Sequence, residues 1–101
     1  MALTPEQHDI LIDWIDRYLI PTKNINPDVD TSDIRKAFME TYAKGFYLSN
    51  ETLNDVLAEL GYHAANFKAD PYLKYSVSSR SPALREYRQW LLNQSTFEKY
   101  E

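Results

Sequence analysis

The sequence predicts an α+β domain that is mainly α, with three helices followed by a β-hairpin and a C-terminal helix. Apolar residues recur every three or four positions in four separate segments, and this period changes to two after Gly61. The chain has 101 residues, of which 44% are hydrophobic. This length and composition suit a single domain, residues 1–101, with a substantial core.

The first helix is predicted to begin at Thr4-Pro5-Glu6-Gln7. Thr4 suits the cap, Pro5 suits the first helical position, and Gln7 completes a capping box. Apolar residues in two rows spaced by four then form a broad buried stripe: Ile10, Leu11, Trp14, Ile15, Tyr18 and Leu19. Pro21 is expected to end the helix, because the residue before a proline avoids the helical conformation. Residues 21–31 are expected to form a polar loop.

The second helix is predicted to start after a cap at Asp30 or Thr31. Its inward side is expected to carry Ile34, Ala37, Phe38 and Tyr42. Gly45 is expected to stop the helix by adopting the left-handed conformation that is common just after helices.

The third helix has the clearest boundaries. Ser49 is the expected N-cap, and Leu48 and Leu53 have the spacing of a hydrophobic staple. The inward residues follow the spacing of an amphipathic helix: Leu53, Val56, Leu57 and Leu60. Gly61 is expected to end the helix in the left-handed conformation, with Tyr62 packed back on Leu57.

After Gly61 the pattern indicates a β-hairpin, with arms at residues 62–67 and 72–78 and a turn at residues 68–71. In the second arm Leu73, Tyr75 and Val77 alternate with polar residues, which predicts that these three point inward.

A fourth helix is predicted to start at Ser81-Pro82, again by a cap followed by a proline. Its expected inward row is Leu84, Tyr87 and Leu91, with Trp90 alongside. Residues 94–101 are expected to fray.

The succession of helix, turn, helix and hairpin over roughly residues 32–78 resembles the winged helix-turn-helix family. The segment GFYLSNETLNDVLAELGY, residues 45–62, is also similar to small, mostly uncharacterised proteins of phages and conjugative elements in Gram-positive bacteria. In those proteins an aromatic turn and an Asn precede a short helix that ends in Gly-Tyr. The first resemblance implies that the third helix enters the major groove of DNA, and the second implies a mobile-element origin.

The outward residues of the third helix depart from that family pattern. Asn50, Thr52 and Asn54 are expected to reach base edges by hydrogen bonding. The same side also carries the acidic residues Glu51, Asp55 and Glu59. Three carboxylates near phosphates are unfavourable, so major-groove binding by this helix is in doubt.

The basic residues gather towards the C-terminal end of the chain. Residues 1–60 hold 5 Lys and Arg against 11 Asp and Glu, whereas residues 61–101 hold 6 against 4. Five of these cations are expected to form a nucleic-acid-binding surface on the hairpin and fourth helix: Lys68, Lys74, Arg80, Arg85 and Arg88. The first hypothesis is therefore a non-catalytic accessory or regulatory factor that binds duplex DNA. The alternative for these cations is an ordinary solvated surface, with arginine stems lying over aromatic rings.

A second hypothesis is a protein–protein interaction module without direct DNA binding, and a homodimer is one form of it. Trp14, Trp90 and eight tyrosines are aromatic residues of the kind that anchor interfaces. The alternative is that both tryptophans fill the core.

Catalysis, cofactors and metals are not expected. There is no cysteine, and His8 and His63 lack the spacing of metal ligands, with His8 expected to pair with Asp9 on the surface. The acids at residues 28–33 resemble a calcium loop only in part, because Asp33 stands where the glycine is needed and Met39 where the bidentate glutamate belongs.

A cytoplasmic protein with no membrane association is expected. No apolar run approaches the ~20 residues of a membrane-spanning helix. The first residues lack the charged and then apolar pattern of a signal peptide.

Overall fold

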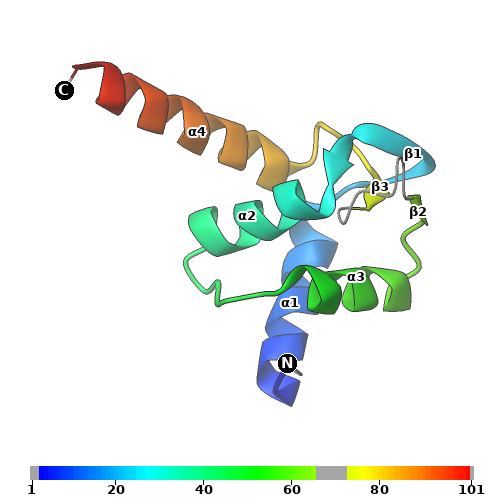
Figure 1. Cartoon of the computed structure of the whole chain (residues 1–101). Coiled ribbons are helices and arrows are strands. Elements are labelled where there is room, and N and C mark those ends of the chain that lie inside the picture. Colours follow the sequence, from blue (N-terminus) through cyan, green and yellow to red (C-terminus); the bar gives the residue numbers. More distant parts are fainter. Residues whose placement is uncertain (1–2, 66–72, 101) are drawn as a thin grey trace.

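The computed structural model describes residues 3–65 and 73–100, and side chains as far as residue 94 (Figure 1). In chain order the elements are α1 (Pro5–Tyr18), β1 (Pro21–Asp30), α2 (Thr31–Thr41), α3 (Asn50–Glu59), β2 (Ala64–Ala65), β3 (Lys74–Val77) and α4 (Pro82–Tyr100). Within the described ranges there are thus four helices and one antiparallel sheet in the order β1-β3-β2. The predicted mainly helical α+β class is confirmed.

The polar loop predicted for residues 21–31 is wrong, because Pro21–Asp30 forms the edge strand β1. The strand pairs with β3 irregularly, with register shifts on both sides of Asn26. The Asn26 amide donates to the Val77 carbonyl oxygen at 3.0 Å and to Ser79 Oγ at 2.7 Å. Its own oxygen accepts from the Asp28 backbone N–H at 2.9 Å. Prolines are tolerated in an edge strand, and the side-chain bonds of Asn26 hold this irregular strand against β3. Because of its prolines, the segment lacks the residue pattern that predicts a strand.

Among the described residues the two arms of the predicted hairpin are present as β2, which begins two residues later than predicted, and β3, which is shorter than predicted. They are antiparallel, with Ala64 opposite Tyr75 and Ala65 opposite Lys74. The turn predicted at residues 68–71 lies outside the described residues. The predicted alternation placed the polar residues Lys74 and Ser76 on the side of the strand opposite Tyr75, but Ser76 is buried together with Tyr75. Ser76 Oγ accepts from the backbone N–H of His63 at 2.9 Å.

The predicted starts of the first three helices are confirmed by their caps. Thr4 and Gln7 form the capping box of α1, each bonded to the backbone N–H of the other at 3.1 Å. Asp30 and Asp33 form a second capping box at α2, and Ser49 accepts from the Thr52 N–H at α3. These bonds satisfy N–H groups that a helix start leaves without partners.

The two glycines have different roles. Gly61 has φ of 87°, and the N–H of Tyr62 bonds to the Leu57 carbonyl, as a left-handed helix end requires. Gly45 was predicted to stop the second helix in the same way, but α2 already ends at Thr41 and Gly45 has no positive φ. A Cβ on Gly45 would instead collide with the Phe38 carbonyl oxygen, so this glycine permits a close approach of two backbone segments.

The core brings together α1, α2, α3, β3 and the first turns of α4. Its centre is aromatic: Trp14 packs edge-on against Phe38 with ring centroids 5.1 Å apart, and Phe46 packs against the same ring at 5.0 Å. The other fully enclosed side chains include Leu11, Ile15, Ile34, Leu48, Leu53, Leu57, Tyr75 and Val77. Trp14 is therefore a core residue, which matches the alternative given for it above.

α4 packs on α2 at its N-terminal end and then projects away from the body of the molecule (Figure 1). Leu84 and Tyr87 are buried, but Leu91 is 43% exposed, so the prediction that Leu91 continues the inward row is wrong. The helix runs to Tyr100, where fraying was predicted from residue 94. At its start the Ser81 hydroxyl accepts from the Ile20 N–H at 2.8 Å and ties α4 to the end of α1.

Candidate interaction surfaces

The outer side of α3, the predicted recognition helix, is acidic. Its exposed residues are Glu51, Asp55, Ala58 and Glu59, which follow one another at helical spacing and are here called the acidic stripe. Glu59 lies 3.2 Å from the ring Nε2 of His8 on α1, so His8 pairs with this residue rather than with Asp9 as predicted. The other two carboxylates form no ion pair within the described residues. This surface repels phosphate groups.

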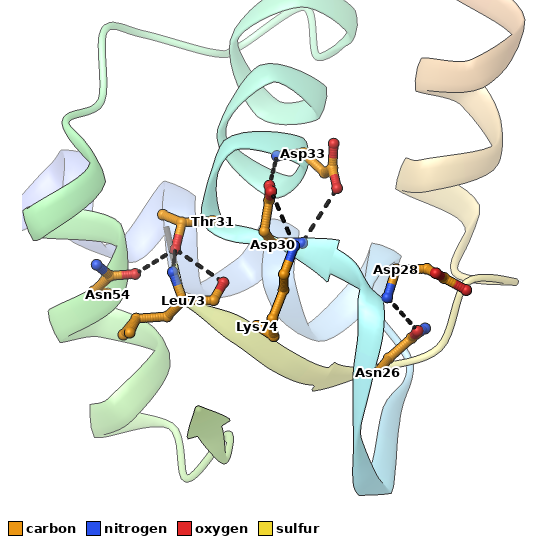
Figure 2. A network of polar contacts seen from close by, with 8 residues as sticks. All are labelled: Asn26, Asp28, Asp30, Thr31, Asp33, Asn54, Leu73 and Lys74. Atoms are coloured by element: carbon orange, nitrogen blue, oxygen red, sulfur yellow. Dashed lines mark hydrogen bonds and ion pairs between the residues drawn. The ribbon is translucent and has the colours of Figure 1, made fainter. Parts of the chain in front are cut away.

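Asn54, predicted to contact bases, instead points into the protein (Figure 2). Its side-chain oxygen accepts from the hydroxyl of Thr31 at 2.8 Å and from the hydroxyl of Tyr75. Both hydroxyl residues are buried, and burial raises the pKa of Tyr75 to about 12. Asn54 therefore joins α3 to the start of α2 and to the central strand.

The other two residues predicted to contact bases, Asn50 and Thr52, are only partly exposed. Thr52 belongs to the cap of α3, because Ser49 Oγ accepts from its N–H and donates to its hydroxyl at 2.9 Å. Asn50 is half-buried, and its side-chain oxygen has no hydrogen-bond partner within the described residues. The three residues predicted for base contacts are thus not gathered on an open surface.

Lys74 is held by an acidic neighbour. It lies opposite Asp30 across the β1–β3 pair, and Nζ is 3.5 Å from the Asp30 carboxylate (Figure 2). Asp33 is close by, and its pKa is raised mainly by burial, against the opposing effects of its hydrogen bond with the Asp30 backbone and of the Lys74 charge. Because its charge is balanced by carboxylates, Lys74 contributes little to an attraction for polyanions.

The three predicted arginines are exposed around the first half of α4. Arg80 lies just before the helix, and Arg85 and Arg88 lie on it. Within the described residues none of them forms an ion pair. Arg85, Arg88, Gln89 and Leu92 share one side of the helix and are here called the arginine stripe. Lys68, the remaining predicted cation, lies outside the described residues.

A groove beside α4 separates part of this surface from β1 and α2. Its volume is about 440 Å³, and it is lined by Asp28, Val29, Asp33, Ser79, Leu84, Tyr87, Arg88 and Leu91. Arg88 therefore borders a space that also contains two carboxylates. The sequence predicts a basic surface on the hairpin and fourth helix. In the structure, acidic residues share that surface with the cations.

Exposed apolar residues accompany both stripes. Leu92 is 61% exposed. On another side of α4 the half-buried Trp90 stacks on Tyr87 with ring centroids 5.9 Å apart. Tyr47, in the turn before α3, is 75% exposed. Neither Tyr47 nor Leu92 is among the candidate residues predicted from the sequence. The signal for Leu92 is its position one residue outside the periodic inward row of the fourth helix.

The described part of the chain contains no group of three or more His, Cys, Asp or Glu residues arranged to hold a metal ion. Of the acids of the partial calcium motif, Asp30 and Asp33 cap α2 and Asp30 also pairs with Lys74, whereas Asp28 lines the groove beside α4. No helix within the described ranges is long and apolar enough to cross a membrane.

Comparison with family models, curated proteins and solved structures found no match to this chain.

Proposed function

We propose that this chain is a non-catalytic protein-binding module built on a winged-helix-like arrangement. Two helices joined by a turn, α2 and α3, are followed by the antiparallel pair β2 and β3, which supports the resemblance to winged helix-turn-helix domains. One fold can serve many functions, so the surface of the module indicates what it binds better than the arrangement of its helices and strands does.

The observation that carries the proposal is the acidic stripe on α3. In a DNA-binding module of this arrangement the outer side of the second helix is the part that faces DNA. Here that side presents Glu51, Asp55 and Glu59, while Asn54 is turned inward to Thr31. Carboxylates oppose binding to phosphate but are favourable opposite a basic protein surface. Exposed Tyr47, four residues before Glu51 in the chain, adds an aromatic side chain of the kind that anchors protein interfaces.

Binding of duplex DNA through α4 is the second candidate. It is favoured by the exposure of Arg80, Arg85 and Arg88 without ion-pair partners in the described part of the chain. It is opposed by the carboxylates of Asp28 and Asp33, which share the groove with Arg88.

Fluorescence anisotropy with labelled duplex DNA separates the two candidates. The wild-type chain is titrated at low and high salt beside a variant carrying Arg85→Ala and Arg88→Ala. A protein-binding module gives little affinity at either salt concentration and no difference between the variants. Affinity that falls steeply with salt, and falls again in the double variant, would establish DNA binding and refute the first candidate.

A further inference from the structure

The acidic stripe and the arginine stripe carry opposite charges on separate helices. Glu51 and Asp55 are one turn apart on α3, and Arg85 and Arg88 are about one turn apart on α4. These four side chains are exposed, and the structure gives none of them an ion pair within the described residues. Each stripe therefore keeps a charge that a complementary surface can neutralise.

The two stripes do not neutralise each other within one molecule. α2 packs against both α3 and α4, and it lies between them in Figure 1, with α4 projecting away on the far side. A contact between an acidic stripe and an arginine stripe thus requires two molecules.

We propose that the protein partner is a second copy of this chain, with the arginine stripe of one copy bound to the acidic stripe of the other. This inference rests on the proposed function, since it identifies the partner of a protein-binding module. The matching spacing lets the two cations of one helix face the two carboxylates of the other. Leu92, which lies on the same side of α4 as the arginines and is 61% exposed, loses exposure to water in the same contact.

The contact joins two different surfaces, so its symmetry has consequences. Two copies can exchange both contacts about a two-fold axis and form a closed dimer, or each copy can use its free stripe to extend a chain. Exposed ion pairs contribute little each, so the association is weak and sensitive to salt. Glu86 on α4 and His8 beside Glu59 reduce the charge difference between the stripes.

Sedimentation velocity of the full chain tests the proposal. The wild type is expected to self-associate at low salt and to dissociate as the ionic strength rises from about 0.1 M to about 1 M, where the Debye length falls from ~10 Å to ~3 Å. Reversal of one stripe, by Arg85→Glu with Arg88→Glu or by Glu51→Arg with Asp55→Arg, is expected to raise the dissociation constant by about tenfold or more.

Charge exchange provides the decisive comparison. An equimolar mixture of the two reversed variants again presents opposite charges, so association is expected to return. It is also expected to return in a single chain that carries all four reversals. Lys36→Glu with Lys44→Glu is the matched control, because it changes the net charge as much as reversal of the arginine stripe but lies on neither stripe.

A wild type that stays monomeric at low salt would overturn the second copy as partner, and so would association that neither reversal weakens. If that monomer also ignores duplex DNA, the proposed protein-binding function stands with another partner. If it binds DNA through Arg85 and Arg88, the proposed function fails as well.

Discussion

Replacing Asn54 by alanine tests whether this residue belongs to the fold or to a surface. Its side-chain oxygen is the acceptor for the Thr31 hydroxyl at 2.8 Å and for the Tyr75 hydroxyl. Thr31 keeps an alternative acceptor in the Leu73 carbonyl at 3.4 Å, whereas the Tyr75 hydroxyl keeps only its interaction with the Thr31 hydroxyl among the described residues. Asn54→Ala thus removes the shared acceptor of two buried hydroxyls and leaves that of Tyr75 the more poorly bonded.

The expected loss follows from these partners. A buried polar group left without a hydrogen bond costs about 1–3 kcal/mol, and a net hydrogen bond contributes about 1 kcal/mol. Asn54→Ala should therefore lower the free energy of unfolding by about 2–3 kcal/mol. For a domain of this length that is a fall in Tm of roughly 10 °C or more.

Chemical denaturation and thermal unfolding by circular dichroism measure this loss. Asp55→Ala, next to it but exposed, is the control and should change the free energy of unfolding by no more than about 0.5 kcal/mol. The double variant of Asn54→Ala and Tyr75→Phe has no poorly bonded hydroxyl on residue 75, so it should lose about 1 kcal/mol less than the sum of its single variants. If Asn54→Ala were as stable as the wild type, and if the losses of Asn54→Ala and Tyr75→Phe simply added in the double variant, the structural role of Asn54 would be refuted.

Three further predictions concern stability. Gly45→Ala should lower the free energy of unfolding by about 1–3 kcal/mol, because the added Cβ meets a backbone oxygen. Gly61→Ala is strained only by the φ of 87° and should lower it by about 1–2 kcal/mol. Losses below about 0.5 kcal/mol in both variants would contradict the roles of both glycines. Asp30→Ala removes a helix cap and an ion pair and should cost about 1–2 kcal/mol in urea denaturation, more than Lys74→Ala, which removes the ion pair alone. Burial raises the pKa of Tyr75 from 10.0 to about 12, so the folded state holds this proton more tightly than the unfolded state does. The free energy of unfolding should therefore fall as the pH rises from 10 towards 12, and Tyr75→Phe should lessen that fall. The same pH dependence in Tyr75→Phe as in the wild type would contradict this prediction.

Local signals in the sequence identified most of the helical framework. The caps at Thr4, Asp30 and Ser49 and the left-handed Gly61 are set by residues within a few positions, and each is found where it was predicted. Such features depend on short-range hydrogen bonds and backbone preferences, which a single sequence displays directly.

The errors concern features that depend on distant parts of the chain. Residues 21–30 form the strand β1 because β3, some 50 residues later in the chain, pairs with them. The Asn26 side chain stabilises this irregular pairing by its hydrogen bond to the Val77 carbonyl. Ser76 is buried and accepts a hydrogen bond from the backbone of His63, which lies 13 residues earlier in the chain. Leu91 has the spacing of an inward residue, but α4 projects past the core that would cover it.

The same limit applies to the candidate site. Sequence position put Asn54 on the outer side of its helix and Lys74 in a basic cluster, yet each has a partner on another element. Only the tertiary structure shows which charged side chains are exposed without an ion-pair partner among the described residues, such as Arg85, and which are neutralised by an opposite charge, such as Lys74. Exposure of Arg80, Arg85 and Arg88 agrees with their expected surface position.

Amide spectra of the ¹⁵N-labelled chain at low ionic strength test most directly whether these stripes serve protein or DNA. With increasing protein concentration, the amide signals of the acidic stripe and the arginine stripe should shift together, and addition of duplex DNA should leave them in place. Signals that ignore protein concentration but move at Arg85 and Arg88 when DNA is added would contradict the account.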